Sequence, residues 1–259
     1  MTGSPMPVRC SWCEGSDIYR QYHDTEWGVP LTNKPALFRL LMLEGQQAGL
    51  SWITILNKRA HMDRQFWGFD PEKLAKASAA HIEGWLTDPG LIRHRGKLAA
   101  LVNNAQITTA VDDFAGWLWS FAAKPTRKKP AQVPAQTLQS QSMSKALKKA
   151  GFRFVGPTIC YAFMQSAGMV NDHHPSCWRF EHCETLVNEA LNAEHELIPI
   201  PADDQKPPIA DDEKKDVEKK AEPVAEGAPG PSSAVSEIGT GLAVTSVEIG
   251  TISPWSFRA

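Results

Sequence analysis

Apolar side chains recur at helical spacing through most of the first 195 residues of this chain, and this pattern constrains the fold more than any other feature. Leu37, Leu40 and Leu41 occupy neighbouring positions of the i, i+3, i+4 pattern, and Thr32 or Asn33 is suited to cap their helix. The same spacing predicts further helices over 51–67, 71–77, 92–109, 114–122, 142–150, 157–167 and 183–195. No run of alternating β-branched residues between turns accompanies them. The sequence therefore predicts an all-α fold.

The composition changes near residue 199, from where Pro, Ala, Asp, Glu, Lys and Ser dominate. Such a segment cannot bury enough apolar surface to offset its chain entropy. We therefore expect a flexible N-terminus over 1–8, a folded domain over 9–198 and a disordered acidic low-complexity tail over 199–259. Within the domain, the Lys-, Pro-, Gln- and Ser-rich stretch 124–141 is typical of a basic surface loop.

The net charge of −2 conceals an uneven distribution of charge along the chain. Residues 1–180 hold 21 Lys and Arg against 13 Asp and Glu, whereas residues 181–259 hold 6 against 16. A positive body suits a polyanionic partner, of which nucleic acid is the commonest. A solvated surface with a solubilising tail explains the same numbers equally well.

Neither a membrane nor a secretory destination is indicated by the sequence. No stretch approaches the ~20 apolar residues that span a bilayer, and the first residues lack a charged start followed by an apolar run. Five cysteines are too few and too uneven for a disulfide framework. We expect an intracellular protein, cytoplasmic if bacterial, with no membrane partner, and nothing suggests other than a monomer.

The stretch 148–164 predicts two helices joined by a short turn. The first ends near residue 151, and the second begins at Pro157, after Gly156 in the turn. Free N–H groups at the start of the second helix, together with Lys148, Lys149 and Arg153, are suited to hold a DNA phosphate without reading its sequence. An ordinary helical hairpin is the alternative.

Cysteine and histidine residues gather near both ends of the predicted domain. Two thiolates and two imidazoles make a closed tetrahedral zinc site, with no position left for a catalytic water. Candidate ligands are Cys10 and His23 near the start, and His173 and Cys177 near the end. Composition alone does not choose among these four and Cys13, His174, His182 and Cys183, and unligated thiols with surface histidines remain the alternative.

The N-terminal third is unusually aromatic, and Glu44 lies within it on a largely apolar helix. Planar side chains stack on bases, and a desolvated carboxylate favours a cationic or donor-rich base. After Glu44, Leu50 falls in a loop beside Trp52, where an apolar tip is suited to wedge into a base stack. The aromatic residues are Trp12, Tyr19, Tyr22, Trp27 and Trp52. Individually they suit a core, and Glu44 suits a surface charge at a helix end.

The chain closely resembles the 3-methyladenine DNA glycosylase I family in long, dispersed runs: YHDTEWGVP (22–30), LEGQQAGLSW (43–52), IRHRGK (92–97), FRFVGPTICY (152–161) and VNDH (170–173). The resemblance covers about residues 9–180. It implies a helix-hairpin-helix DNA glycosylase fold with one structural Zn²⁺ and no organic cofactor. It also implies an enzyme that acts on damaged double-stranded DNA and releases N3-methyladenine.

The resemblance also implies roles for particular residues. It selects as zinc ligands Cys10, His23, His173 and Cys177, although Cys13 leaves the first ligand open to a swap. It assigns recognition of the methylated base to Glu44, stacking to Trp52 and a pocket hydrogen bond to Tyr22. The aromatic wall is completed by Trp12, Tyr19 and Trp27, and Gly49 and Leu50 lie in the loop that meets the DNA. The acidic tail lies outside the family pattern.

Methylation at N3 makes the adenine a cation and weakens its bond to the sugar, so selection and positioning carry most of the catalysis. We expect the lesion to be flipped out, stacked on Trp52 and held by Glu44 while water attacks C1′ and leaves an abasic site. The family pattern places no lysine there, so no lyase step is expected. Glu44 is the expected general base, with Asp172 as the alternative. A zinc-containing DNA-binding module without catalysis and an interaction scaffold acting through the tail are the competing hypotheses.

Overall fold

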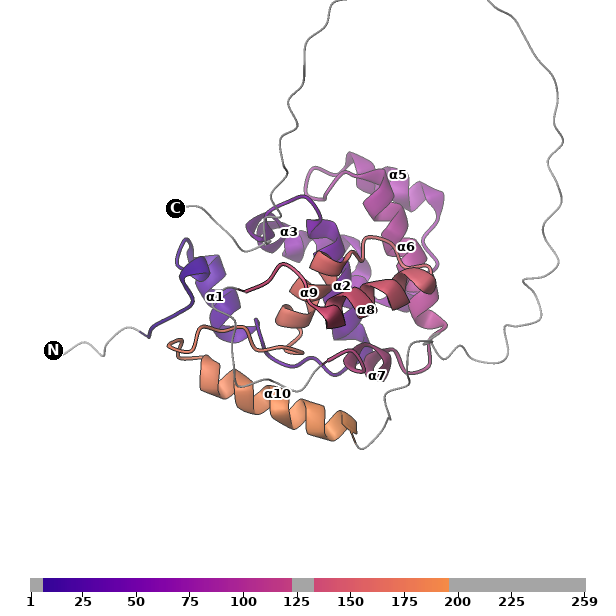
Figure 1. Cartoon of the computed structure of the whole chain (residues 1–259). Helices are drawn as coiled ribbons and strands as arrows, with labels where there is room; N and C mark the ends of the chain where they lie inside the picture. Colours follow the sequence, from indigo (N-terminus) through magenta and orange to yellow (C-terminus); the bar gives the residue numbers. More distant parts are fainter. Residues whose placement is uncertain (1–6, 123–132, 196–259) are drawn as a thin grey trace, which may run out of the picture. The chain divides into compact units, whose positions relative to one another are not determined.

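A computed structural model describes residues 7–122 and 133–195 (Figure 1). Helices make up the regular structure of these two ranges, and no extended strand occurs in them, so the all-α prediction is confirmed there. No helix in the described part of the chain combines the length and the apolar character needed to cross a membrane. The predicted tail and half of the predicted basic loop, residues 124–132, lie outside the described residues.

Ten α-helices and two short 3-10 turns follow one another along the described chain. They are η1 (Ser11–Cys13), α1 (Asp17–Thr25), α2 (Lys34–Gln47), α3 (Trp52–Gln65), η2 (Trp67–Phe69), α4 (Pro71–Leu74), α5 (Ala79–Thr87), α6 (Arg95–Thr109), α7 (Phe114–Trp119), α8 (Leu138–Lys149), α9 (Pro157–Ser166) and α10 (Phe180–His195).

Local side-chain chemistry explains where the helices begin. Asn33, rather than Thr32, caps α2, because its side chain accepts a hydrogen bond from the Ala36 N–H. Thr137 and Ser140 form a reciprocal capping box at the start of α8. The helix therefore begins at 138, inside the stretch 124–141 that the sequence predicted as loop.

Helix α2 lies in the middle of the described domain, where it packs against α3, α6, α7 and α9 (Figure 1). Its last turn, from Glu44 to Gln47, is buried. The chain then reverses at Gly49, whose φ of +76° is a backbone conformation that suits glycine. This reversal leaves Leu50 exposed before α3 begins.

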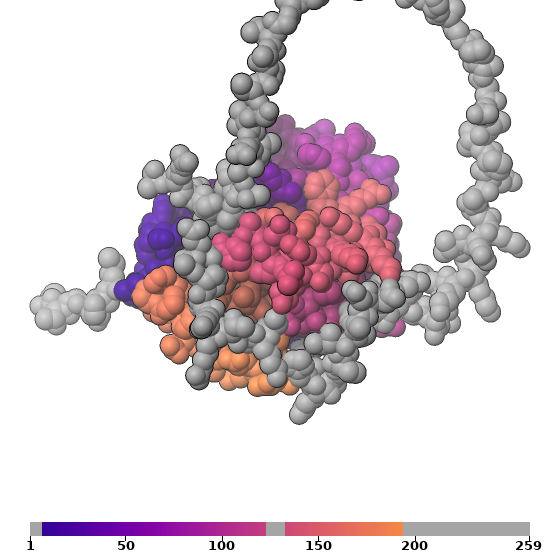
Figure 2. All heavy atoms as spheres, viewed as in Figure 1, coloured from indigo at the N-terminus to yellow at the C-terminus, as the bar shows by residue number. Residues whose placement is uncertain are grey.

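The two ends of the described domain lie together. The N–H of Trp178 donates to the carbonyl of Val8 at 3.0 Å, and the indigo and orange atoms meet on one face of Figure 2. Helix α10 buries Cys183, Val187 and Leu191, which recur every four residues, and packs against α7. This confirms the predicted helix over 183–195, which begins three residues earlier than predicted.

Candidate functional site

Four predicted metal ligands come together in the interior. One ligand atom from each of Cys10, His23, His173 and Cys177 lies within 4.8 Å of all the others, and all four residues are buried. Cys177 Sγ lies 3.4 Å from His23 Nε2 and 3.6 Å from His173 Nδ1, and Cys10 Sγ lies 3.7 Å from His173 Nδ1. Zn–S and Zn–N bonds at tetrahedral angles place ligand atoms roughly 3.3–3.8 Å apart. The donor set therefore fits a four-coordinate Zn²⁺.

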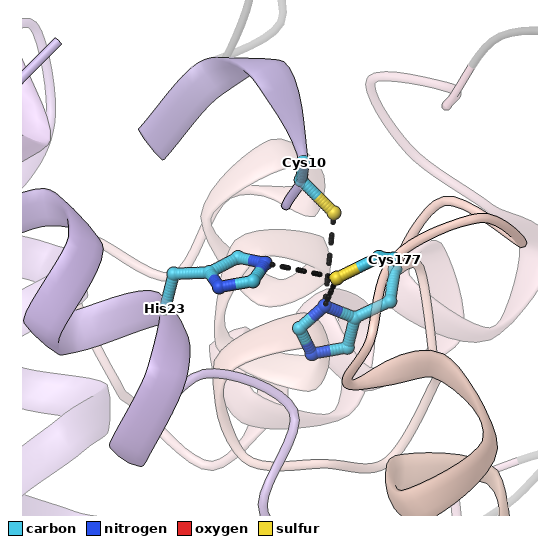
Figure 3. Close-up of side chains that lie close together, drawn as sticks. Cys10, His23 and Cys177 are labelled. Atoms are coloured by element: carbon cyan, nitrogen blue, oxygen red, sulfur yellow. Dashed lines mark hydrogen bonds between the residues drawn. The ribbon is translucent and has the colours of Figure 1, made fainter. Parts of the chain in front are cut away.

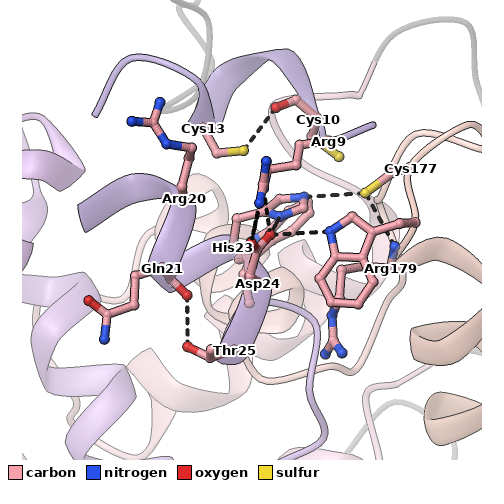
Figure 4. Close-up of polar contacts among 12 residues, drawn as sticks. Arg9, Cys10, Cys13, Arg20, Gln21, His23, Asp24, Thr25, Cys177 and Arg179 are labelled. Atoms are coloured by element: carbon pink, nitrogen blue, oxygen red, sulfur yellow. Dashed lines mark hydrogen bonds and ion pairs between the residues drawn. The ribbon is translucent and has the colours of Figure 1, made fainter. Parts of the chain in front are cut away.

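The outer nitrogens of both histidines face groups that only accept hydrogen bonds, and Figure 4 shows His23 beside Asp24. His23 Nδ1 lies 2.8 Å from Asp24 Oδ1, and His173 Nε2 lies 3.2 Å from the carbonyl of Trp27. These nitrogens therefore carry the protons, and the lone pairs of His23 Nε2 and His173 Nδ1 are left for the metal. Arg9 holds the Asp24 carboxylate in place at 2.9 Å.

The backbone supports the thiolate ligands as well. The N–H of His174 points to Cys10 Sγ at 3.3 Å, and the N–H of Arg179 points to Cys177 Sγ at 3.5 Å. Figure 3 shows Cys10, His23 and Cys177 pointing toward one another from the N-terminal segment, α1 and the segment before α10. Cys13 instead donates to the carbonyl of Cys10 and lies outside the group.

Glu44 is fully buried near the end of α2. Its Oε1 accepts a hydrogen bond from Ser166 Oγ at 3.0 Å, and Ser166 in turn accepts one from the hydroxyl of Tyr22 at 3.0 Å. Glu44 Oε2 has no hydrogen-bond partner among the described residues. Burial raises the pKa of this carboxyl to about 8.

Glu44 Oε2 is therefore available to accept a hydrogen bond from a ligand. A buried oxygen without a donor is destabilising, so a site that retains one is suited to receive a donor or a cation. Ser166 contributes by fixing the other oxygen, and it is absent from the residues that the sequence predicted for the site. Its contact joins α2 and α9 across 122 residues, and no local pattern indicates such a contact.

The five predicted aromatic residues form one cluster beside this carboxyl. The ring of Trp12 lies 5.8 Å from Tyr19, 6.5 Å from Tyr22 and 5.0 Å from Trp27, and Tyr22 lies 5.6 Å from Trp52. Tyr19 accepts the N–H of Ile53 at 3.0 Å, which ties α1 to the first turn of α3. Trp12 is half-buried, whereas the other four rings are buried.

The predicted DNA-contacting residues lie on two exposed segments. Leu50 is 39% exposed and follows Gly49. Lys148 and Arg153 are exposed in and after the last turn of α8. Gly156 immediately precedes α9. Apart from its chain neighbours, no atom of the described residues lies within 4 Å of the position that a Cβ would take there, so this helix start is open to a ligand.

Asp172, the alternative general base, is already engaged. Its Oδ2 accepts hydrogen bonds from the hydroxyl of Tyr161 at 2.5 Å and from Gln165 Nε2 at 2.9 Å. The carboxylate thus joins α9 to the segment that carries His173. Asp172 is therefore better suited to orient the segment that carries the metal-ligand candidate His173 than to act as a general base.

Comparison with known proteins identifies the family of this chain. A family model described as methyladenine glycosylase matches residues 12–180. The chain belongs to the methyladenine glycosylase family. It is 46% identical over 177 residues to DNA-3-methyladenine glycosylase 1 of Escherichia coli K12, covering 65% of this chain and 95% of that relative. It is 47% identical over 180 residues to DNA-3-methyladenine glycosylase of Haemophilus influenzae, covering 66% and 97%.

Solved structures agree with this assignment. A crystal structure of 3-methyladenine DNA glycosylase I matches with a TM-score of 0.64 at 45% identity and covers 66% of this chain and 98% of its own. The Staphylococcus aureus enzyme, described for its recognition of 3-methyladenine, matches with a TM-score of 0.62 at 36% identity, covering 66% and 96%. A variant crystallised with 3-methyladenine matches equally well, with a TM-score of 0.62. The present protein is thus a glycosylase of this family and shares its helical fold.

Proposed function

We propose that this protein is a base-excision repair enzyme that flips N3-methyladenine out of alkylated duplex DNA and releases it by hydrolysis. The observation that carries this proposal is the buried Glu44, whose Oε2 lacks a donor beside the aromatic cluster. A relative crystallised with 3-methyladenine supports the choice of base. A protein that only binds the DNA backbone has no need of such a carboxyl.

Glu44 selects the lesion by charge. In a site without water, a carboxylate interacts far more strongly with a cation than it does in solution. N3-methyladenine in DNA carries that positive charge and adenine does not, so the ionised carboxylate stabilises the lesion selectively. Ser166 and Tyr22 keep the carboxylate oriented while the base is bound.

The flipped base stacks on Trp52, inside the wall formed by Tyr19, Tyr22 and Trp27. Because these rings and Glu44 are buried, an entering base must displace a side chain. Trp12 is the most exposed member of the cluster, and we propose that it moves. Unstacking a base from the duplex costs roughly a few kcal/mol and costs least for a damaged base, which adds to selectivity.

The duplex is held by two segments. Leu50 fills the gap that the flipped base leaves, as apolar wedges do in other kinked duplexes. The helical hairpin of α8 and α9 binds a phosphate through Lys148, Arg153 and the open N–H groups after Gly156, as in a helix-hairpin-helix. These contacts position the DNA without reading its sequence.

Hydrolysis then needs little further assistance, because the cationic base is a good leaving group. Water attacks C1′ as the glycosidic bond breaks, and Glu44 accepts the proton that the water loses. The enzyme is monofunctional, since the family pattern places no lysine at the base. The buried Lys97 donates to two backbone carbonyls instead. A Schiff base trapped with borohydride would overturn this assignment.

One structural Zn²⁺ is held by Cys10, His23, His173 and Cys177. When bound, the ion supplies folding energy by joining the N-terminal segment to the end of the domain. The closed donor set leaves no position for a reacting water. We further propose that the enzyme domain spans 9–198, that it acts as an intracellular monomer and that the tail over 199–259 takes no part in catalysis.

The decisive experiment measures free bases released from methylated duplex DNA by the zinc-loaded wild type, Glu44→Ala, Glu44→Gln and Asp172→Asn. We expect 3-methyladenine release by the wild type and its selective loss in both Glu44 variants. Full activity of Glu44→Gln with loss in Asp172→Asn at unchanged zinc content would reverse the base assignment. No release by the wild type would leave a DNA-binding relative without catalysis.

A further inference from the structure

Helix α6 carries two buried polar side chains whose hydrogen bonds the proposed chemistry does not use. Lys97 is 5% exposed and Asn104 is 2% exposed. They are seven residues apart, which places them two turns apart on the same face of the helix. Each one bonds to the backbone of a different segment that is proposed to touch DNA.

Lys97 holds the end of α2. Its Nζ donates to the carbonyls of Gln46 and Ala48, both at 2.7 Å. The last carbonyls of a helix lack partners within the helix, and a cation at that end is favourable. Gly49 and Leu50 follow directly, so the ammonium group fixes the base of the loop that carries the proposed wedge.

Asn104 holds the turn between α8 and α9. Its Nδ2 donates to the carbonyl of Arg153 at 3.0 Å, and its Oδ1 accepts the N–H of Arg153 at 2.9 Å. Asn103 adds a hydrogen bond to the carbonyl of Gly151 at 3.0 Å. Phe154, the residue after Arg153, has a φ of +58°, an unfavourable conformation that the surrounding contacts must maintain.

The two attachments border one small cavity. Its volume is about 10 Å³, and its lining includes residues of both attachments: Gln46, Lys97, Asn104, Arg153 and Phe154. The hydrogen bonds that orient Glu44 come from Ser166 and Tyr22 and involve neither Lys97 nor Asn104. A duplex, however, must meet the wedge and the phosphate site at the same time, so their separation has to be fixed.

We propose that Lys97 and Asn104 are positioning residues that use α6 as a brace between the Leu50 loop and the hairpin turn. This inference rests on the proposed function and extends it. The brace holds both segments in the register that a kinked duplex needs while the flipped base is in the pocket. Loss of either attachment therefore impairs excision from DNA and leaves recognition of the free base intact.

The test compares Lys97→Met, Lys97→Arg and Asn104→Leu with the wild type in two assays. The first is release of 3-methyladenine from methylated duplex DNA, and the second is binding of free 3-methyladenine, followed by tryptophan fluorescence. Misplaced groups of this kind slow catalysis by about ten- to a hundredfold. We expect that loss for Lys97→Met and Asn104→Leu, recovery in Lys97→Arg, and unchanged free-base affinity.

Two control substitutions distinguish the proposed positioning role from the general loss of a side-chain hydrogen bond to the backbone. Lys34 also donates to one backbone carbonyl, that of Val111, and Gln106 ties α6 to the carbonyl of Ala75. Neither bond reaches a proposed DNA segment, so Lys34→Met and Gln106→Leu should excise as the wild type does. If Asn104→Leu does not fold, Asn104→Asp keeps the acceptor for the N–H of Arg153 and replaces the donor to its carbonyl by a carboxyl oxygen, which also places a charge at this buried position.

A double-mutant cycle with Leu50→Ala tests whether Lys97 acts through the loop that carries Leu50. The effects of two substitutions are not additive when one residue acts through the other. If Lys97 acts through the loop, Lys97→Met should add little to the defect of Leu50→Ala. The brace would be overturned if Lys97→Met slowed excision by the same factor in the wild-type and the Leu50→Ala backgrounds. A parallel fall in affinity for the free base would also overturn it. Wild type that releases no base would instead overturn the proposed function.

Discussion

At the scale of residues, the proposed selectivity for a cationic base and the expected pH dependence both depend on the carboxyl group of Glu44. Its pKa is about 8 in the folded protein because it is buried, and its ordinary value is 4.5. Between these values the folded state holds a proton that the unfolded state has lost. Raising the pH through this window therefore destabilises the fold by up to about 1.4 kcal/mol per pH unit.

Glu44→Gln removes this proton linkage while keeping the shape of the side chain. The contribution of the neutral carboxyl to stability is complete below pH 4.5 and declines as the pH rises toward 8. We therefore expect the free energy of unfolding of Glu44→Gln to rise relative to that of the wild type between about pH 5.5 and 8. Urea unfolding of the zinc-loaded proteins measures the difference, and a difference independent of pH would contradict the buried carboxyl.

Ser166 gives a second prediction at the same scale. Its hydrogen bond lowers the pKa of Glu44, opposing the effect of burial. Because we propose that the ionised carboxylate holds the cationic base, kcat/KM should rise with pH as Glu44 ionises. Ser166→Ala should move the midpoint of this rise to higher pH and slow excision near neutrality by about tenfold, the loss expected for one charge-assisted hydrogen bond. An unchanged midpoint would show that Ser166 only packs against α2.

At the scale of elements, the four proposed zinc ligands come from segments that no disulfide connects within the described residues. Cys10 and His23 lie at the start of the domain, and His173 and Cys177 lie before α10. We expect one zinc per chain and a fall in Tm of about 10 °C or more in Cys177→Ser, because a structural ion contributes several kcal/mol to folding. Metal analysis and thermal unfolding measure both.

Cys13→Ser is the matched control for this experiment. Its thiol is buried as the ligands are, and it donates to the carbonyl of Cys10 outside the group. It should therefore retain a full complement of zinc. A chain that loses zinc on Cys13→Ser and keeps it on Cys10→Ser would show that the ligand swap left open by the sequence occurs.

The sequence predicts elements well where the signals are local. Asn33 and the apolar positions after it identify α2, and the two helices around Gly156 follow from their turn and Pro157. The sequence predicts no helix over α1 or α5, because the large apolar side chains of each cover only about one turn: Ile18, Tyr19 and Tyr22 in α1, and Ile82, Trp85 and Leu86 in α5. Ser166, Lys97 and Asn104 were missed for another reason. Their partners lie about 50 or more residues away along the chain, and only the packing of α2, α6 and α9 brings them together.

At the scale of the whole molecule, charge is divided between the enzyme domain and the C-terminal segment. Helix α10 shows that part of the acidic end is folded, with Glu181 and Glu184 in its first turns. The segment 199–259 adds 11 acidic residues against 6 basic ones. A polyanionic partner is attracted by the body of the chain and repelled by this segment.

Removal of residues 199–259 should therefore strengthen binding to undamaged duplex DNA at low salt and leave base release at saturating DNA unchanged. The gain should vanish as salt rises, because the screening length falls to about 3 Å at 1 M. Binding titrations over a salt series with the full chain and with 1–198 measure this, and thermal unfolding of both checks that the domain is intact. A shortened chain that binds DNA more weakly would assign the segment a direct part in the complex, and one that loses base release at saturating DNA would place it in the catalytic domain.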